Sequence, residues 1–153
     1  MINGAYTGTF MDFTMGGQIM SRILVIDDDK FVRASIRAVL ESVGHEVFDA
    51  GDADVGISQQ HINPFDIAIV DLVMPKKEGL ETIHELKQDF PDLPIIAISG
   101  GGAIVKKNFI QAAEAFGATT TLEKPFGGDE LLNAISFAVS DGVKPNTSTS
   151  ASA

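Results

Sequence analysis

The chain has 153 residues, of which 44% are hydrophobic, and a formal net charge of −10. This composition predicts one globular domain with a single core, and no apolar run approaches the roughly 20 residues of a membrane-spanning helix. The absence of cysteine excludes disulfides, thiolate metal sites and a cysteine nucleophile, and the acidic balance argues against direct nucleic-acid binding and favours cations or basic protein surfaces.

The two ends of the chain differ in composition from the rest. Residues 1–20 carry one charge, Asp12, and lack the basic start and long apolar centre of a secretory signal. We interpret them as a disordered or cloning-derived extension, with Met20 as a natural start. Residues 141–153 are rich in Ser, Thr and Ala and indicate a disordered tail. Residues 21–140 are therefore predicted to form the domain.

The domain begins with an apolar run followed by a helical pattern. Residues 23–26 are predicted to form the first strand, and the helix after it ends at Gly44. The apolar face of this helix is predicted to consist of Val32, Ile36, Val39, Leu40 and Val43, with Arg33, Arg37 and Glu41 off that face.

A second strand and a less regular helix come next. The strand is predicted at residues 46–48, and Asp52 is expected to cap the helix. Val55 and Ile57 are the candidates for its buried side, and Gly56 weakens the helical pattern.

Two further strand–helix units occupy the middle of the domain. Strands are predicted at residues 67–70 and 95–98, and a helix after each. The helix after Met74–Pro75 carries Leu80, Ile83, Leu86 and Phe90 inward. The helix after Gly100–Gly102 carries Ile104, Phe109, Ile110, Ala113 and Phe116 and ends at Gly117.

The last unit is a strand at residues 119–123 and a helix capped by Asp129, with Leu131, Leu132, Ile135 and Val139 apolar. Five strand–helix units in a row predict an α/β fold with an open parallel sheet covered by helices on both faces. We expect a flavodoxin-like, doubly wound, five-stranded sheet of order 2-1-3-4-5 with five helices, whose ligand site lies at the switch point between the first and third strands.

Polar residues stand at the ends of four predicted strands. They are Asp27, Asp28 and Asp29 after the first, Asp71 after the third, Ser99 after the fourth and Lys124 after the fifth. Because the carboxyl ends of parallel strands share one edge of the sheet, these groups are expected to converge in one pocket. Carboxylates, a hydroxyl and an ammonium suit a hard cation and a phosphoryl group, and adjacent carboxylates repel unless a cation compensates them.

The order and spacing of these segments resemble the receiver domain of bacterial two-component response regulators, of the stand-alone chemotaxis-regulator type. The matching segments are Val25–Asp29, Val70–Pro75 with Gly79 after it, Ile98–Gly100 and Glu123–Phe126. The resemblance covers roughly residues 21–140. It implies a phosphoacceptor that takes a phosphoryl group from a histidine kinase or phosphotransfer protein onto Asp71. Such a protein is not an enzyme in the usual sense, although it assists its own phosphotransfer and dephosphorylation.

The resemblance also implies a magnesium site. Asp28, Asp71 and the carbonyl of Val73 would bind Mg²⁺ directly, and Asp27 would act mainly through water. Asp29 would cap the first helix or shape the rim of the site. Which of Asp27 and Asp28 binds directly is left open by the sequence, since adjacent strand residues point to opposite faces unless the strand is ending.

Lys124 and Ser99 complete the implied site. Together with Asp71 they are the candidate catalytic residues, because the ammonium and the hydroxyl would contact the phosphoryl oxygens. The family also implies a cis peptide between Lys124 and Pro125. Thr121 stands where many members carry a switching Tyr or Phe, which departs from the family pattern.

The implied setting is cytoplasmic. The partners would be a kinase or phosphotransfer protein and a downstream target protein, without direct nucleic-acid or membrane contact, and a phosphorylation-dependent homodimer is an open alternative. No output domain fits after Ser140, so output is expected through protein–protein contact. The three histidines, His45, His61 and His84, lack metal-ligand spacing and are interpreted as surface or strand-edge residues.

Two other functions fit part of the sequence. The segment Val25–Asp29 also fits the start of a haloacid-dehalogenase-type phosphatase, with Asp27 as nucleophile and Asp29 as acid and base. No paired acidic motif follows Lys124, and Asp71–Pro75 would then be unexplained. A pseudo-receiver that binds partners without phosphorylation is the other alternative, but none of the site residues is lost.

Overall fold

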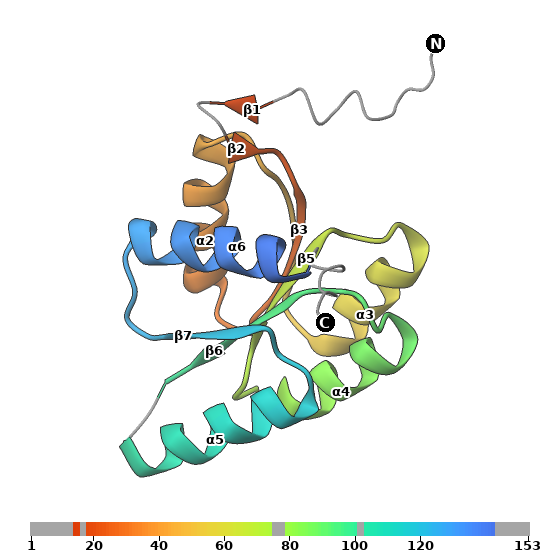
Figure 1. The fold of residues 1–153 in the computed structure, drawn as a ribbon, viewed down its shortest axis with the longest axis vertical. Coiled ribbons are helices and arrows are strands. Elements are labelled where there is room, and N and C mark those ends of the chain that lie inside the picture. The colour runs from red at the N-terminus through yellow and green to blue at the C-terminus, as the bar shows by residue number, and fades with distance from the viewer. Residues whose placement is uncertain (1–13, 16–17, 75–78, 101–102, 143–153) are drawn as a thin grey trace, which may run out of the picture.

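In the computed structural model, the described residues are 14–15, 18–74, 79–100 and 103–142 (Figure 1). Five parallel strands form one sheet, namely β3 (Arg22–Ile26), β4 (Glu46–Ala50), β5 (Ile67–Asp71), β6 (Ile95–Ser99) and β7 (Thr120–Glu123). The helices are α2 (Lys30–Ser42), α3 (Ala53–Ile62), α4 (Gly79–Asp89), α5 (Ala103–Phe116) and α6 (Gly128–Gly142). The sheet order β4-β3-β5-β6-β7 confirms the predicted flavodoxin-like topology.

The sheet separates two hydrophobic cores. Along β3, Ile23 and Val25 pack with α2 and α6, whereas Leu24 and Ile26 pack with the helices on the opposite face. All four side chains are fully buried, because helices cover both faces of the sheet, as Figure 1 shows. The continuously apolar strands of the sequence are explained by this double coverage.

Helix α2 follows β3 directly and starts beside the acidic residues. Asp29 is its N-cap, and its carboxylate accepts hydrogen bonds from the backbone N–H groups of Phe31 and Val32. Ile36 and Leu40 are the buried residues of the predicted apolar face. The helix ends at Ser42, and Gly44 follows with a φ of 97°.

In helix α3, the predicted burial is wrong for Val55 and right for Ile57. Val55 is 45% exposed rather than buried, whereas Ile57 and Gly56 are buried. A Cβ atom at Gly56 would lie 2.4 Å from Cδ1 of Ile26, so the helix approaches the sheet at a distance that no side chain permits. The glycine that weakens the helical pattern is therefore required by helix–sheet packing. Asp52 caps this helix as predicted, accepting a bond from the N–H of Val55.

Helix α6 starts differently from the expectation. Asp129 lies inside its first turn and is not the N-cap. Instead, the Glu130 carboxylate accepts a hydrogen bond from the N–H of Gly127 at 2.8 Å, which is the backward half of a capping box. The helix extends to Gly142, two residues into the predicted tail, and the rest of that tail lies outside the described residues.

The N-terminal extension contains one described element. Strands β1 (Thr14–Met15) and β2 (Gln18–Ile19) pair antiparallel, in a segment for which the sequence predicts no strand. No helix among the described residues is long and apolar enough to cross a membrane.

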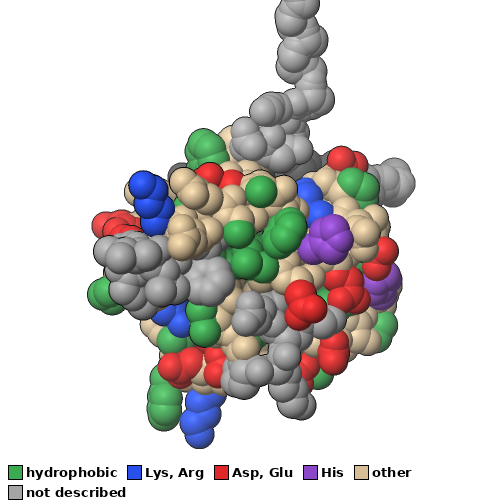
Figure 2. Space-filling view, turned by 90° about the horizontal axis from the view of Figure 1, so that it is seen from below, with side chains coloured by type: hydrophobic (Ala, Val, Ile, Leu, Met, Phe, Trp, Pro, Cys, Tyr) green, Lys and Arg blue, Asp and Glu red, His purple; other side chains and the backbone are tan. Residues whose placement is uncertain are grey.

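Each of the three histidines contacts another residue of the domain. His45 directly precedes β4, which matches the strand-edge part of the prediction, and it is buried, with its Nδ1 accepting a hydrogen bond from the backbone N–H of Ser21. His61 and His84 are exposed; Figure 2 shows histidine side chains among acidic ones on the face seen there. His61 pairs with Asp89 at 3.0 Å, and the His84 ring contacts Phe116, which is 42% exposed although it belongs to the predicted apolar face.

Candidate functional site

Three carboxylates meet at the carboxyl edge of the sheet. Asp27, directly after β3, is fully buried, Asp71 at the end of β5 is 5% exposed, and Asp28 is exposed. One carboxylate oxygen from each lies within 4.8 Å of the others. Within the part of the chain that the structure describes, this is the one group of three or more acidic or histidine side chains arranged to hold a metal ion. The strand ends thus bring the carboxylates together as expected.

Lys124 reaches the same cluster from the end of β7. Its Nζ lies 3.4 Å from Oδ2 of Asp27 and 3.6 Å from Oδ2 of Asp71. The Lys124–Pro125 peptide is cis, as the resemblance implied. The backbone N–H of Lys124 donates to the carbonyl of Ser99, so the ends of β6 and β7 are held side by side.

The cluster is electrostatically uncompensated. Burial and the nearby charge of Asp27 together raise the pKa of Asp71 to about 6, although the Lys124 ammonium opposes the shift. One ammonium at 3.4–3.6 Å therefore does not balance the buried acidic groups. A divalent cation among the three carboxylates would supply the missing positive charge.

Two buried polar atoms of the described residues lack a hydrogen-bond partner. They are Oδ2 of Asp27 and Oγ of Ser99. The other oxygen of Asp27, Oδ1, accepts a bond from the N–H of Asp29 at 2.9 Å. Oδ2 of Asp27 has only the Lys124 ammonium beside it, at 3.4 Å, and Oγ of Ser99 has no hydrogen-bond partner. Buried polar atoms are seldom left in this state, so these two indicate a ligand that completes the site. Hard oxygen donors around an uncompensated charge fit Mg²⁺.

The neighbouring residues have other tasks. The Asp29 carboxylate caps the N-terminus of α2 and does not belong to the three-carboxylate group. In the phosphatase alternative, Asp29 would instead be the acid and base. Val73 is 54% exposed, and its N–H lies 3.4 Å from Oδ1 of Asp71. Whether its carbonyl binds a metal stays a prediction.

Gly79, the first residue of α4, packs closely against the backbone of Asp71. A Cβ atom at this position would lie 2.2 Å from the carbonyl oxygen of Asp71. The N–H of Gly79 donates to the carbonyl of Leu72 at 3.0 Å. This close approach explains why a glycine follows the Val70–Pro75 segment. Lys76, Lys77 and Glu78 lie outside the described residues.

A groove opens beside Lys124. It has a volume of about 600 Å³ and lies between the start of α2 and the β7–α6 connection. Its lining residues are Phe31, Val32, Ser35, Gly100, Lys124, Pro125 and Phe126. Phe31 is 75% exposed, so an aromatic ring stands at the rim of the acidic site.

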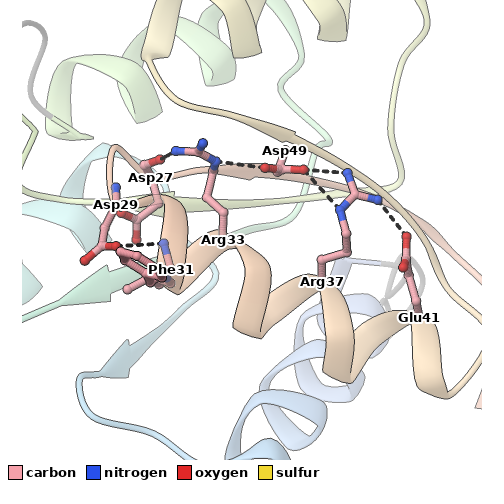
Figure 3. Close-up of polar contacts among 8 residues, drawn as sticks. Asp27, Asp29, Phe31, Arg33, Arg37, Glu41 and Asp49 are labelled. Atoms are coloured by element: carbon pink, nitrogen blue, oxygen red, sulfur yellow. Dashed lines mark hydrogen bonds and ion pairs between the residues drawn. The ribbon is translucent and has the colours of Figure 1, made fainter.

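The sequence did not predict a network in which two arginines of α2 bond Asp49 of β4 next to the acidic cluster. Figure 3 shows Arg33 and Arg37 of α2 flanking Asp49 of β4, with Arg33 also reaching the backbone of Asp27. The two arginines appear in the sequence only as polar residues off the apolar face of a helix. The signal for their role is Asp49, a charged and partly buried residue next to the last position of β4.

The fold and this edge define a doubly wound α/β domain with an acidic cluster and an ammonium at its switch point. A family model for the response regulator receiver domain matches residues 23–136. The DNA-binding transcriptional regulator NtrC of Azospirillum brasilense is 35% identical over 123 residues, covering 80% of this chain and 25% of that protein. Response regulator MprA of Mycobacterium sp. (strain KMS) is 35% identical over 111 residues, covering 72% and 47%.

A solved structure agrees with these relatives. The receiver domain of NtrX from Brucella abortus superimposes with a TM-score of 0.72 at 31% identity, over 76% of this chain and 97% of that one. The chain belongs to the response regulator receiver family. It spans between a quarter and a half of the length of the two curated relatives named above. These relatives do not favour the phosphatase or pseudo-receiver alternatives.

Proposed function

We propose that this chain is a phosphoacceptor that takes a phosphoryl group onto Asp71 in a magnesium-dependent reaction. The convergence of Asp71 with Lys124 and the two other carboxylates at one sheet edge carries the proposal. The unpartnered hydroxyl of Ser99 supports it, because a phosphoryl oxygen is a suitable acceptor for that group.

The three carboxylates would hold the metal. Asp28 and Asp71 would be direct ligands with the Val73 carbonyl, and the buried Asp27 would act mainly through water. When bound, Mg²⁺ neutralises charge at the acceptor and on the incoming phosphoryl group. Asp28 is the exposed member of the group, so it is the carboxylate that an entering hydrated ion meets first.

The proposed step is a displacement at phosphorus. A carboxylate oxygen of Asp71 attacks a phosphohistidine, the O–P bond forms and the N–P bond breaks, and the imidazole leaves. The Lys124 ammonium offsets the negative charge on the phosphoryl oxygens, and the Ser99 hydroxyl donates to one of them. The same groups would assist later hydrolysis of the acyl phosphate. In this sense the chain takes part in its own chemistry without being a conventional enzyme.

The phosphoryl donor would be a cytoplasmic histidine kinase or phosphotransfer protein. The apolar groove at Phe31 and Phe126 supports this, because it borders Lys124 and would lie under the protein that presents the phosphohistidine. Replacing the exposed ring in Phe31→Ala is expected to slow transfer from such a protein. Transfer from acetyl phosphate, which has no docking surface, should stay unchanged. Equal slowing with both donors would contradict this role of the groove.

The central test is the intact mass of the protein after treatment with acetyl phosphate. One phosphoryl group should be added in magnesium and none in EDTA. Asp71→Asn keeps the size of the side chain but cannot form an acyl phosphate, so its mass should not change. Labelling of that variant at Asp27 or Asp29, or turnover of a generic phosphate monoester, would favour the phosphatase. Absence of wild-type labelling would favour a pseudo-receiver.

A further inference from the structure

We propose that Arg33 is a positioning residue of the acidic site, oriented by Asp49, and that it fixes the peptide joining Asp27 to Asp28. The inference rests on the proposed function, since it concerns how the chain shapes the same magnesium site. Arg33 touches none of the three clustered carboxylates, so its effect is exerted through the backbone.

The contact is direct and short. Nη1 of Arg33 donates to the backbone carbonyl oxygen of Asp27 at 2.7 Å. The backbone N–H of Asp27 donates to the carbonyl of Ala50 at 3.2 Å. Both backbone polar groups of Asp27 are therefore engaged at the point where β3 ends, and Figure 3 shows the bond from Arg33. The carbonyl held by Arg33 belongs to the peptide whose nitrogen is that of Asp28.

This peptide decides whether two adjacent carboxylates converge. Along a continuing strand, neighbouring side chains point to opposite faces of the sheet. Here Asp27 is buried and Asp28 is exposed, yet both lie within the same 4.8 Å group as Asp71. Convergence requires a defined backbone orientation between them, and the hydrogen bond from Arg33 holds that orientation.

The guanidinium is itself held in place. Nε of Arg33 donates to Oδ2 of Asp49 at 2.8 Å, so the same planar group bridges a strand carboxylate and the Asp27 carbonyl. Arg37 donates to the other oxygen of Asp49, and also to Glu41. Partial burial alone would raise the pKa of Asp49, but hydrogen bonds from Arg37 and Arg33 outweigh it and lower that pKa. Asp49 is therefore charged at neutral pH.

Space around Arg33 is also limited. A Cβ atom at Gly51 would lie 3.2 Å from Nη1 of Arg33, closer than an ordinary contact. The side chains of Arg33 and Asp49 are 19% and 23% exposed. A glycine at this position gives the guanidinium room to lie across the end of β4 and reach Asp27.

Charge and geometry predict opposite results, which makes the inference testable. Removing a positive charge near a cation site should tighten magnesium binding by Coulomb's law. Losing the hydrogen bond that orients the ligands should weaken it, and such supporting contacts change metal affinity by roughly 10–100-fold. Arg33→Met is therefore expected to raise the Kd for magnesium roughly tenfold. Arg37→Met removes the same charge from the same network without touching Asp27, and should leave the Kd unchanged or slightly lower it.

Arg33→Lys separates charge from shape. It keeps the positive charge, but one ammonium lacks the planar fork that bridges Asp49 and the Asp27 carbonyl. We expect its Kd to be raised as well. This variant also keeps the test open if Arg33→Met does not fold.

Magnesium affinities would be measured by amide NMR titration, because the chain has no tryptophan. In metal-free protein, hydrogen exchange at the Asp28 and Asp29 amides should be faster in Arg33→Met than in Arg37→Met. A wild-type Kd in Arg33→Lys, or equal Kd values for Arg33→Met and Arg37→Met, would overturn the positioning role while leaving the proposed function intact. Failure of the wild type to bind magnesium would instead overturn the proposed metal site.

Discussion

The amino and carboxyl edges of the sheet both carry polar groups at the strand ends, but these groups differ in whether they have partners within the protein. At the amino edge, the guanidinium of Arg22 donates to Glu46 and to the carbonyls of Asn63 and Pro64, and the backbone N–H of Arg22 donates to the Asp66 carboxylate. The carboxyl edge instead contains the acidic cluster and two buried atoms without hydrogen-bond partners.

The polar groups at the amino edge are bonded within the protein, whereas those at the carboxyl edge are left available for a ligand. Polar atoms bonded within the protein contribute to folding, whereas buried atoms without partners cost free energy until a ligand completes them. Arg22 and Arg33 illustrate the contrast, because both pair with an acidic residue of β4 and bond a backbone carbonyl. Only Arg33 acts at the edge where the carboxylates converge.

The largest expected effect is the loss of phosphoryl labelling, which should follow a substitution at the carboxyl edge and not one at the amino edge. Asp71→Asn should abolish labelling by acetyl phosphate, measured as intact mass. Asp66→Ala, which removes an acidic residue at the amino edge, should leave the extent of labelling unchanged. Loss of labelling in both variants would mean that the reaction reports on folding and not on the site.

The pH dependence of stability sharpens the contrast. In metal-free protein, the pKa of Asp71 is raised from 3.8 to about 6. Between these values the unfolded chain has lost the proton while the folded chain still binds it, so stability falls as pH rises. At about 1.4 kcal/mol for each pH unit, the loss is about 2 kcal/mol between pH 4 and pH 6, because the unfolded chain is already partly deprotonated at pH 4 and the folded chain is half deprotonated at pH 6.

Urea unfolding of the wild type and Asp71→Asn across this range would isolate the contribution. His45, whose pKa burial lowers, changes stability in the opposite direction but is common to both proteins. The free energy of unfolding of wild type should fall relative to the variant as pH rises. A difference that does not depend on pH would contradict the buried, uncompensated charge.

Magnesium should stabilise the carboxyl edge. At a hundredfold excess over its Kd, the gain in unfolding free energy is about 2.7 kcal/mol. Asp28→Asn should lose most of this gain. Asp29→Asn is the matched control, because Asn is also a good N-cap and the residue lies outside the acidic group. Equal loss in the two variants would show that net charge, and not ligation, sets the effect.

Lys124→Ala should uncouple phosphorylation from the response. A charge-assisted contact of this kind contributes about 2 kcal/mol. Some labelling of Asp71 is expected to survive, since the acceptor and metal ligands remain. Hydrogen exchange at the end of β6 and the start of α5 would be compared with and without beryllofluoride, which mimics the phosphoryl group. The wild type should change and the variant should not, and an equal change in both would assign the response to another contact.

The smallest effect belongs to the amino edge. Asp66→Ala removes the acceptor of the Arg22 N–H, which lies 2.8 Å away, and should lower the free energy of unfolding by about 1 kcal/mol. The magnesium-induced gain in stability should remain as in wild type. A reduced gain would mean that the two edges are coupled through β3.

The structure changed the reading of individual helices more than that of the strands. Gly56 appears in sequence as a weak point of a helix, but its contact with Ile26 shows that packing requires it. Asp129 resembles an N-cap, yet α6 starts one residue before it. Helix boundaries and buried faces depend on neighbouring elements that a local pattern does not contain.

The sequence by itself determined the strand–helix order and the acidic, hydroxyl and ammonium groups at the strand ends. It did so because doubly covered strands are continuously apolar, and parallel strands must end at a common edge. Only the tertiary structure decided that Arg33 bonds the Asp27 carbonyl while Asp49 orients it. That arrangement brings a side chain of α2 against β4 and the end of β3, and distances across such a junction are set by how a helix packs on a sheet and not by spacing along the chain.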